Sequence, residues 1–251
     1  MILHGGGSVG EASFRYILSL SEEYKVIAPT LPVGVSTVED TVKGLHTICE
    51  KEDIEEVHFL GFSQGGMIAQ CFVRAHPELT QSLILFVSMG PSQDYAKKFN
   101  QYRTMIGLVP APLFRLLSKY FITKQISAES VNSSEAEKEF WLTFSREMFE
   151  SRRMNKELML SQTDVLIDYF ENYRFTKDDL ETWDGAILII EAENDRIVSD
   201  KERQDLKELY PQVKTILLEN SGHFGTGLLQ PMEIINKISE FVSNSSQQGQ
   251  T

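Results

Sequence analysis

Residues 57–70 read VHFLGFSQGGMIAQ, in which an apolar run of strand length, a Gly-x-Ser-x-Gly pentapeptide and a helix-like run follow one another without a gap. This context predicts that Ser63 lies on a sharp turn between a strand and a helix, with strained dihedrals and its hydroxyl above the sheet edge. Gly61 and Gly65 have no Cβ, so the strand and the departing helix can pass close together. The first amides of the helix, with their partial positive charge, favour an oxyanion beside the serine.

A Gly-x-Ser-x-Gly pentapeptide alone is a weak sign of catalysis, because a serine in that position is often only a turn residue. Nucleophilic catalysis also needs a base, a group that orients the base and amides that stabilise an oxyanion. Ser63 is therefore interpreted as a nucleophile only if the rest of the chain supplies these groups.

The composition is that of an ordinary globular protein. The 251 residues are enough for one α/β domain or two small ones, and 41% of them are hydrophobic and 24% charged. The net charge of −12 argues against a nucleic-acid or anionic-membrane partner, because phosphate binding needs concentrated Lys and Arg. The sequence has no signal-peptide pattern and no apolar run of about 18 residues, so we expect a cytoplasmic protein without a membrane span.

The chain has two cysteines, Cys49 and Cys71, and both fall within predicted helices. So few thiols argue against a disulfide framework and against a zinc site. We therefore expect two buried free thiols, and no metal.

Strand-like and helix-like patterns alternate over the first ninety residues. Short apolar runs predict strands at residues 2–3, 24–28, 57–62 and 83–87, and helical spacing predicts helices at 11–20, 36–51 and 64–76. Ser36 is a candidate N-cap, with Glu39 three residues later as in a capping box. The alternation is typical of α/β proteins with a mostly parallel, doubly wound sheet.

From about residue 92 to residue 183 the sequence contains no convincing strand pattern. Helical patterns cover residues 94–106, 112–120 and, as one long helix, about 134–170, and they are rich in aromatic residues. An aromatic stripe at helical spacing usually belongs to a core. A long helical insertion between two strands of a sheet is nevertheless a good candidate for a lid, and we predict one here.

The strand pattern resumes at residues 186–191 and 214–218, with a helix at 201–209 between them. Asp195 comes just after the first of these strands and His223 just after the second. An amphipathic helix at 232–242 closes the fold.

The order of these motifs resembles the α/β-hydrolase fold family. The elbow at Ser63 is followed by an acid after a later strand and a histidine after the last strand, and His4-Gly5-Gly6 follows an early strand. The resemblance, to an esterase-like or maspardin-like member, covers nearly the whole chain. It places the helical insertion at the family's usual lid position.

The resemblance implies a core of residues 1–91 and 184–242, a helical lid at 92–183 and a disordered tail at 243–251. The first two strands of the usual fold are missing from this sequence. The predicted sheet therefore has six strands, with residues 24–28 as an exposed edge. Either upstream residues are absent or a partner, such as a second copy in a homodimer, covers this edge.

The resemblance also implies a catalytic triad. Ser63 is the expected nucleophile, His223 the base that takes its proton, and Asp195 the acid that fixes the histidine tautomer. The backbone N–H groups of Gly6 and Gln64 are the expected oxyanion hole. This set predicts a serine hydrolase of carboxylesterase type that cleaves an ester, a lactone or a thioester without a cofactor.

Other histidines and acids have more ordinary interpretations. His46, His58 and His76 lie in or at the ends of predicted helices and strands, and His4 is expected to shape the glycine loop. Asp195 fits the acid loop better than its neighbours Asp184, Glu191, Glu193 and Asp200.

Apolar residues flank the expected catalytic loops, which indicates a small-molecule ester with a medium-sized hydrophobic acyl or alcohol group as the substrate. The candidate substrate-binding residues are Met67, Met89, Val198 and Phe224. Two alternatives stay open. The same triad supports hydrolysis of carbon–carbon or peptide bonds, and a non-catalytic binding or scaffold protein could keep this fold.

Overall fold

The computed structural model describes residues 1–129, 134–211, 213–225, 227 and 231–248. In this part of the chain five strands form one sheet in the order β1-β2-β3-β4-β5, and every neighbouring pair is parallel. The strands are β1 (Ile2–Leu3), β2 (Val57–Phe62), β3 (Thr80–Phe86), β4 (Ala186–Ala192) and β5 (Lys214–Leu218). The predicted α/β architecture with a parallel sheet is confirmed.

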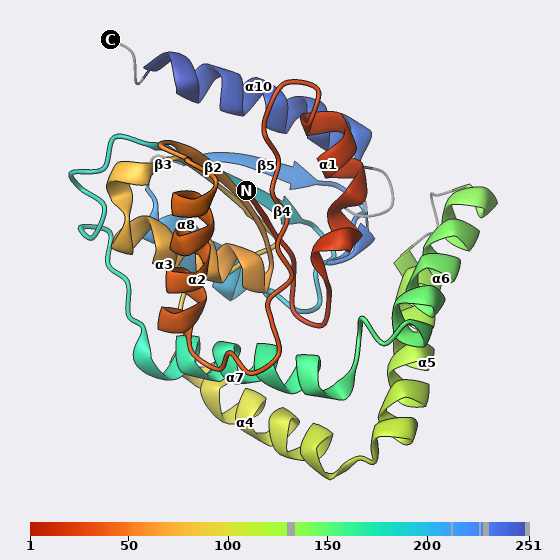
Figure 1. Cartoon of the computed structure of the whole chain (residues 1–251). Helices are drawn as coiled ribbons and strands as arrows, with labels where there is room; N and C mark the ends of the chain where they lie inside the picture. Colours follow the sequence, from red (N-terminus) through yellow and green to blue (C-terminus); the bar gives the residue numbers. More distant parts are fainter. Residues whose placement is uncertain (130–133, 212, 226, 228–230, 249–251) are drawn as a thin grey trace.

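Helices cover both faces of the sheet (Figure 1), which explains why the central strands are continuous apolar runs. One face carries α2 (Val38–Lys51), α3 (Gln64–Ala75) and α8 (Asp200–Leu209). The other carries α1 (Phe14–Leu20) and α10 (Met232–Gln248). Short 3-10 turns, η1 (Gly10–Ser13) and η2 (Pro77–Leu79), precede α1 and β3.

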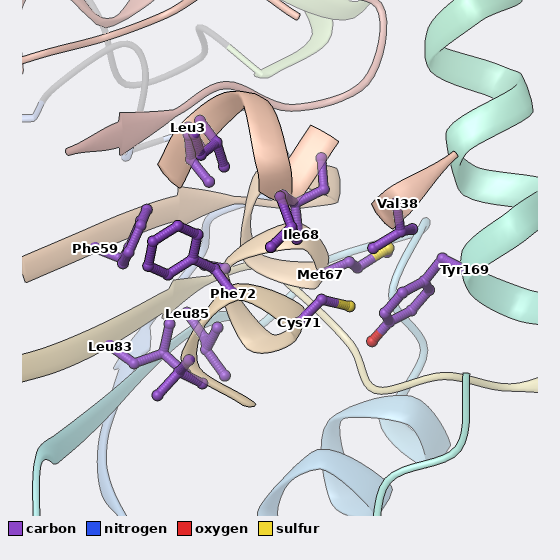
Figure 2. Packing of buried hydrophobic residues seen from close by; sticks show 14 of the residues in the cluster. Leu3, Val38, Phe59, Met67, Ile68, Cys71, Phe72, Leu83, Leu85 and Tyr169 are labelled. Carbon is purple, nitrogen blue, oxygen red and sulfur yellow. The ribbon is translucent and has the colours of Figure 1, made fainter. Parts of the chain in front are cut away.

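The first of these layers holds a large part of the core. Figure 2 shows Phe59 of β2 against Phe72 of α3, and their ring centroids are 4.7 Å apart. Met67 and Cys71 of α3 point from the same helix toward Tyr169 of the lid. The layer therefore joins the helix that follows Ser63 both to the sheet and to the insertion.

The expected strand at residues 24–28 is corrected, because these residues form no strand. The amide of Ile2 donates to the carbonyl of Ile27 at 2.8 Å, so the segment lies beside β1. β1 is only two residues long and Pro29 ends the segment, so there is no partner of sufficient length for a regular ladder. The sheet of the described residues has five strands and not six.

The insertion between β3 and β4 is helical, and the described part of residues 92–183 contains no strand. Its helices are α4 (Gln93–Leu108), α5 (Ala111–Glu129), α6 (Glu135–Glu150) and α7 (Lys156–Asn172). α7 packs against α4 and α2, whereas α5 and α6 pair as a hairpin at the side of the molecule (Figure 1).

The expectation of one long helix over residues 134–170 is wrong, because the chain breaks between α6 and α7. Arg152 adopts a positive φ of 60°, which ends the helical path. Asn155 then caps α7, since its side-chain oxygen accepts a hydrogen bond from the amide of Leu158 at 2.8 Å.

Two helix ends also differ from the sequence-based expectation. The N-cap of α2 is Thr37 and not Ser36, and its hydroxyl accepts from the amide of Asp40 at 3.1 Å. α10 continues through Gln248, so the predicted disordered tail is wrong for residues 243–248. Buried Ser245 donates to the carbonyl of Phe241 at 2.8 Å within this helix. Residues 249–251 lie outside the described part of the chain.

Cys49 and Cys71 are free and buried, as predicted. Burial raises the pKa of both thiols. Among the residues that the structure describes, none of the helices combines the length and hydropathy that crossing a bilayer would need.

Candidate active site

Ser63 lies on the turn between β2 and α3, with φ 48° and ψ −114°. A residue with a side chain rarely adopts a positive φ, so the turn is strained. The amide of Ser63 donates to the carbonyl of Phe86 at 2.8 Å, and the hydroxyl of Ser88 donates to the carbonyl of Ser63 at 2.8 Å. These bonds to β3 and to the loop that follows it hold the serine in the strained conformation predicted from the sequence.

The glycines around Ser63 are required by close backbone contacts. A Cβ on Gly61 would lie 2.5 Å from the Cα of Gly66, and a Cβ on Gly65 would lie 2.2 Å from the carbonyl oxygen of Leu3. Neither neighbour is a flexible side chain that could move aside. The predicted close passage of strand and helix is confirmed.

Asp195 and His223 are in direct contact. The Oδ2 atom of Asp195 lies 2.7 Å from Nδ1 of His223, and its Oδ1 atom accepts the amides of Ile197 at 2.8 Å and Val198 at 2.9 Å. The side chains of Asp195 and His223 are 1% and 6% exposed. An ionised carboxylate requires the Nδ1–H tautomer of the imidazole, which leaves Nε2 as the basic nitrogen.

Backbone contacts fix the two loops that carry this pair. The amide of Asn194 donates to the carbonyl of Ser221 at 2.8 Å, which joins the acid loop to the histidine loop. The hydroxyl of Tyr16 on α1 donates to the carbonyl of Gly227 at 2.6 Å. The position of His223 is therefore set by its own loop, by the acid loop and by α1.

Ser63, Asp195 and His223 follow β2, β4 and β5, whose carboxyl ends lie at one edge of the parallel sheet. Phe86 contacts both the serine turn and the chain that follows His223. Its carbonyl accepts the amide of Ser63, and a Cβ on Gly227 would lie 2.2 Å from its ring. The structure thus joins Asp195 and His223 directly and places Ser63 at the same edge.

The glycine loop lies against the elbow. A Cβ on Gly5 would be 3.5 Å from the Cβ of Ser63, and a Cβ on Gly6 would be 2.9 Å from the Oε1 atom of Gln64. Both expected oxyanion residues, Gly6 and Gln64, are therefore neighbours at the start of α3.

His4 supports the glycine loop from within the core. Its Nδ1 atom lies 2.8 Å from the carbonyl of Gly5, and its Nε2 atom accepts the amide of Leu31 at 3.1 Å. One donor and one acceptor define a neutral ring, and burial lowers the pKa of His4 to about 4. His4 therefore stabilises the glycine loop through these hydrogen bonds.

Gln162 of α7 is a site residue that the sequence did not reveal. Its Oε1 atom accepts the amide of Gly7 at 2.7 Å, its Nε2 atom donates to the carbonyl of Ser8 at 3.0 Å, and its own carbonyl accepts from the side chain of Gln64 at 2.7 Å. Gln162 thus ties the lid to the glycine loop and to α3. The one sign of its role in the sequence was its position as a polar residue on the apolar face of a predicted helix. That position does not indicate which groups it binds.

Glu129, the last residue of α5, was also not predicted. Its Oε2 atom accepts the amide of Phe224 at 2.8 Å, directly after His223. A Cβ on Gly222 would lie 2.6 Å from the same oxygen, so the histidine loop passes tightly under this carboxylate. Burial raises the pKa of Glu129, and the neighbouring Phe224 amide and His223 oppose that change.

Of the four candidate substrate-binding residues, Met67, Met89 and Val198 are at most 4% exposed and pack in the core. Phe224 is partly exposed, and its ring centroid lies 5.1 Å from that of His223. A cavity of about 260 Å³ lies elsewhere, at the opposite end of β2, where Met1, Tyr24 and Val57 line it. Its distance from the catalytic loops argues against a role for that cavity in the chemistry.

The remaining histidines lie away from the expected triad. His46 of α2 and His76 after α3 stack on each other with ring centroids 4.2 Å apart, and His58 of β2 bonds to Ser82 at 2.8 Å. The described residues hold no group of three or more His, Cys, Asp or Glu side chains arranged to bind a metal ion.

The sequence model of the "alpha/beta hydrolase fold" family matches residues 1–226, and the chain belongs to this family. An uncharacterized hydrolase of Bacillus subtilis (strain 168), YcgS, is 24% identical over 249 residues, covering 89% of this chain and 84% of the relative. The fold, the family match and this relative together define a hydrolase of the α/β family.

Solved structures share the same fold. The meta-cleavage product hydrolase CumD of Pseudomonas fluorescens IP01 superposes with a TM-score of 0.72 at 19% identity, covering 97% of this chain and 89% of that one. A thermophilic esterase of Thermogutta terrifontis superposes with a TM-score of 0.70 at 21% identity, with the same shares covered. Identities this low establish the fold alone.

Proposed function

We propose that this chain is a serine hydrolase of the carboxylesterase type, which cleaves a carboxylic ester, a lactone or a thioester through an acyl-enzyme on Ser63. The observation that carries the proposal is the buried Asp195–His223 contact of 2.7 Å at the sheet edge where the strained Ser63 turn lies. Strain at a non-glycine residue persists only where the surrounding structure maintains it, and such residues cluster at active sites.

In the proposed reaction, Nε2 of His223 takes the proton of the Ser63 hydroxyl while the oxygen attacks the ester carbonyl. Asp195 holds Nδ1–H and stabilises the imidazolium that forms. The tetrahedral oxyanion receives hydrogen bonds from the amides of Gly6 and Gln64. Collapse expels the alcohol, which takes the proton from His223, and water then repeats the sequence to release the acid.

The proposed substrate is a small-molecule ester with a medium-sized apolar acyl or alcohol group. Phe224 is the candidate contact for that group, because its partly exposed ring lies beside His223. Met67, Met89 and Val198 belong to the hydrophobic core, so Phe224 is the one of the four candidates with an exposed surface for a substrate. The proposal needs no metal or other cofactor, since the chain itself supplies nucleophile, base and acid.

The proposal is tested by fluorophosphonate labelling followed by intact mass measurement, with wild type beside Ser63→Ala, His223→Ala and Asp195→Asn. We expect one adduct on wild type, none on Ser63→Ala and slower labelling of the other two variants. Ser21→Ala is the matched control, because it changes an exposed serine at the end of α1 that makes no contact with the Ser63 turn.

A panel of acetyl, butyryl and hexanoyl esters then tests the substrate. Preference for the longer acyl groups supports an apolar pocket, and preference for acetyl contradicts it. A folded wild type that is neither labelled nor active on esters would contradict the serine hydrolase itself and favour a binding or scaffold protein. Labelling without ester turnover would direct the search to carbon–carbon or peptide bonds.

A further inference from the structure

Exposed apolar side chains gather in one place on the lid. Of the fourteen large hydrophobic residues that are exposed in the described part of the chain, eight lie between residues 102 and 121. We name this group the α4–α5 corner, and its members are Tyr102, Met105, Leu108, Leu113, Leu116, Leu117, Tyr120 and Phe121. Exposed apolar side chains that concentrate on two consecutive helices are a feature of interaction surfaces.

The corner is a defined structural feature. α4 ends at Leu108 and α5 begins at Ala111, and Figure 1 shows the bend between them at the periphery of the molecule, away from the sheet. Lys156 of α7 fastens the bend, because its ammonium donates to the carbonyls of Gly107 and Val109 at 2.8 Å each. The apolar side chains are therefore displayed on an anchored bend.

α5 packs through only a narrow stripe. Phe114 and Ile126 are its buried residues, and Ile122 is partly buried in the cluster with Trp141 of α6. At 100° per residue, Leu113, Leu117 and Tyr120 lie on the side of the helix turned away from that stripe. The outward side of α5 is thus apolar without a covering element among the described residues, and Leu116 and Tyr120 are 65% and 67% exposed.

The corner lies in a basic segment of an acidic protein. Residues 93–129 contain six Lys or Arg and two Asp or Glu, whereas the whole chain has a net charge of −12. Two of the six cations are paired with carboxylates of neighbouring helices, Arg103 with Asp164 at 2.6 Å and Lys119 with Glu150 at 3.0 Å. Lys97 and Lys98 on α4 precede the apolar residues in the sequence, Lys124 on α5 follows them, and all three are exposed. The other four cations stand against Asp94 and Glu129, so this segment keeps a small excess of positive charge although the whole chain is acidic.

We propose that the α4–α5 corner docks onto an anionic lipid surface. An exposed apolar face with aromatic residues, flanked by basic side chains, has the chemistry that inserts into the headgroup region and attracts acidic lipids. The acidic residues elsewhere oppose this weakly, because salt screens exposed charges beyond about 8–10 Å. A symmetric pair of copies joined through the same face would bring like charges together, which disfavours a homodimer there.

The docking proposal is independent of the hydrolase proposal, and its readout is binding. The test is co-sedimentation of the full chain with vesicles of phosphatidylcholine alone and with vesicles that also contain phosphatidylglycerol. We expect partitioning onto the phosphatidylglycerol vesicles that weakens as salt is raised. The double variant Leu116→Ser/Leu117→Ser should bind about tenfold more weakly or worse, because it removes two apolar side chains from the contact.

The matched control is Leu18→Ser on α1, since Leu18 has the same 65% exposure as Leu116 but lies outside the corner. It should bind like wild type. Lys97→Gln/Lys98→Gln should lose about tenfold on phosphatidylglycerol vesicles. Circular dichroism of each variant checks that the fold is intact.

Three outcomes overturn the proposal. The first is absence of binding to phosphatidylglycerol vesicles, and the second is equal loss in Leu18→Ser and in the corner variant. The third is a dimer, seen by light scattering, that the corner variant abolishes while vesicle binding is absent, which would assign the surface to a second copy. Equal binding to both kinds of vesicle would contradict the role of the basic residues.

Discussion

Single residues around the elbow have little freedom because backbone atoms from three segments converge there. Ser63 keeps a positive φ, and Gly61 and Gly65 face backbone atoms at distances that no Cβ tolerates. The neutral ring of His4 lies in the same region and braces the glycine loop. The absence of a Cβ at the two glycines and the neutral state of the His4 ring are therefore what this region requires.

Gly65→Ala is expected to prevent stable folding or to displace β1, because its Cβ would lie 2.2 Å from the carbonyl oxygen of Leu3. Thermal unfolding of the purified variant measures this effect. Gly44→Ala is the control, since Gly44 lies within α2 and a Cβ there meets nothing within 4 Å. It should stabilise the protein by about 0.5–1 kcal/mol. Equal stability of the two variants would contradict the steric explanation.

The free energy of unfolding should decrease as the pH is lowered, because of the buried neutral ring of His4. Burial lowers its pKa from 6.5 to about 4, so between these values the unfolded chain binds more protons than the folded one. The stabilisation is present above pH 6.5 and is lost as the pH falls toward 4, by about 3 kcal/mol. His58, whose pKa burial also lowers to about 4, contributes in the same window.

The test is urea unfolding of wild type and His4→Asn at several pH values. His4→Asn should be less stable than wild type at pH 7.5, with the difference shrinking as the pH approaches 4. A difference that is independent of pH would mean that the pKa of His4 is the same in the folded and the unfolded chain, which would contradict the effect of burial.

At the scale of elements, the helical insertion contacts the expected catalytic loops through Gln162 and Glu129. Gln162 of α7 binds the glycine loop and Glu129 of α5 binds the histidine loop. These contacts span 155 and 95 positions of sequence. The helical insertion therefore contributes to the geometry of the loops that carry the expected catalytic residues.

Glu129→Gln and Glu129→Ala separate the two effects of this carboxylate. The glutamine keeps an acceptor for the Phe224 amide but removes a negative charge near His223, which also faces the carboxylate of Asp195. We expect Glu129→Gln to move the acid limb of the kcat/KM profile to lower pH, because the imidazole then loses its proton more readily.

Glu129→Ala should in addition lower kcat, by roughly tenfold, because it frees the histidine loop. Steady-state kinetics on an ester between pH 5 and 9 measures both effects. If Glu129→Gln had the wild-type profile, the carboxylate would act only as a hydrogen-bond acceptor.

At the scale of the whole molecule, one sheet separates two hydrophobic clusters. Phe72 belongs to the cluster with α2, α3 and α7, and Ile238 belongs to the cluster with α1 and α10. Both clusters pack on β2, β3 and β4, so the loss of either should weaken the entire domain. The charge is also uneven along the chain, because residues 93–129 carry an excess of Lys and Arg in an acidic protein.

Phe72→Ala and Ile238→Ala are each expected to destabilise the protein by about 2–5 kcal/mol, because both side chains are buried. Both should retain a single unfolding transition, since the clusters share the sheet. Leu18→Ala, at an exposed position, should change stability by less than about 0.5 kcal/mol. Calorimetry measures all three, and two separate transitions in either core variant would contradict a shared core.

Much of the architecture could be predicted because it depends on local pattern. Apolar runs locate β2 to β5, and the glycines at 61 and 65 locate the elbow, since only glycine tolerates that approach. Apolar patterns were insufficient where the backbone conformation depends on a neighbouring strand or on a helix break. The segment 24–28 lacks a strand because β1 is short, and the helix at 134–170 is broken by Arg152 and the Asn155 cap.

The sequence by itself determined the fold class, the order of Ser63, Asp195 and His223 along the chain, and the need for glycine beside the serine, because these follow from short-range sterics and strand order. The Asp195–His223 contact, the lid contacts of Gln162 and Glu129, and the gathering of exposed apolar residues at the α4–α5 corner arose only in three dimensions. They join or expose side chains whose neighbours are distant in sequence, and no local pattern encodes such neighbours.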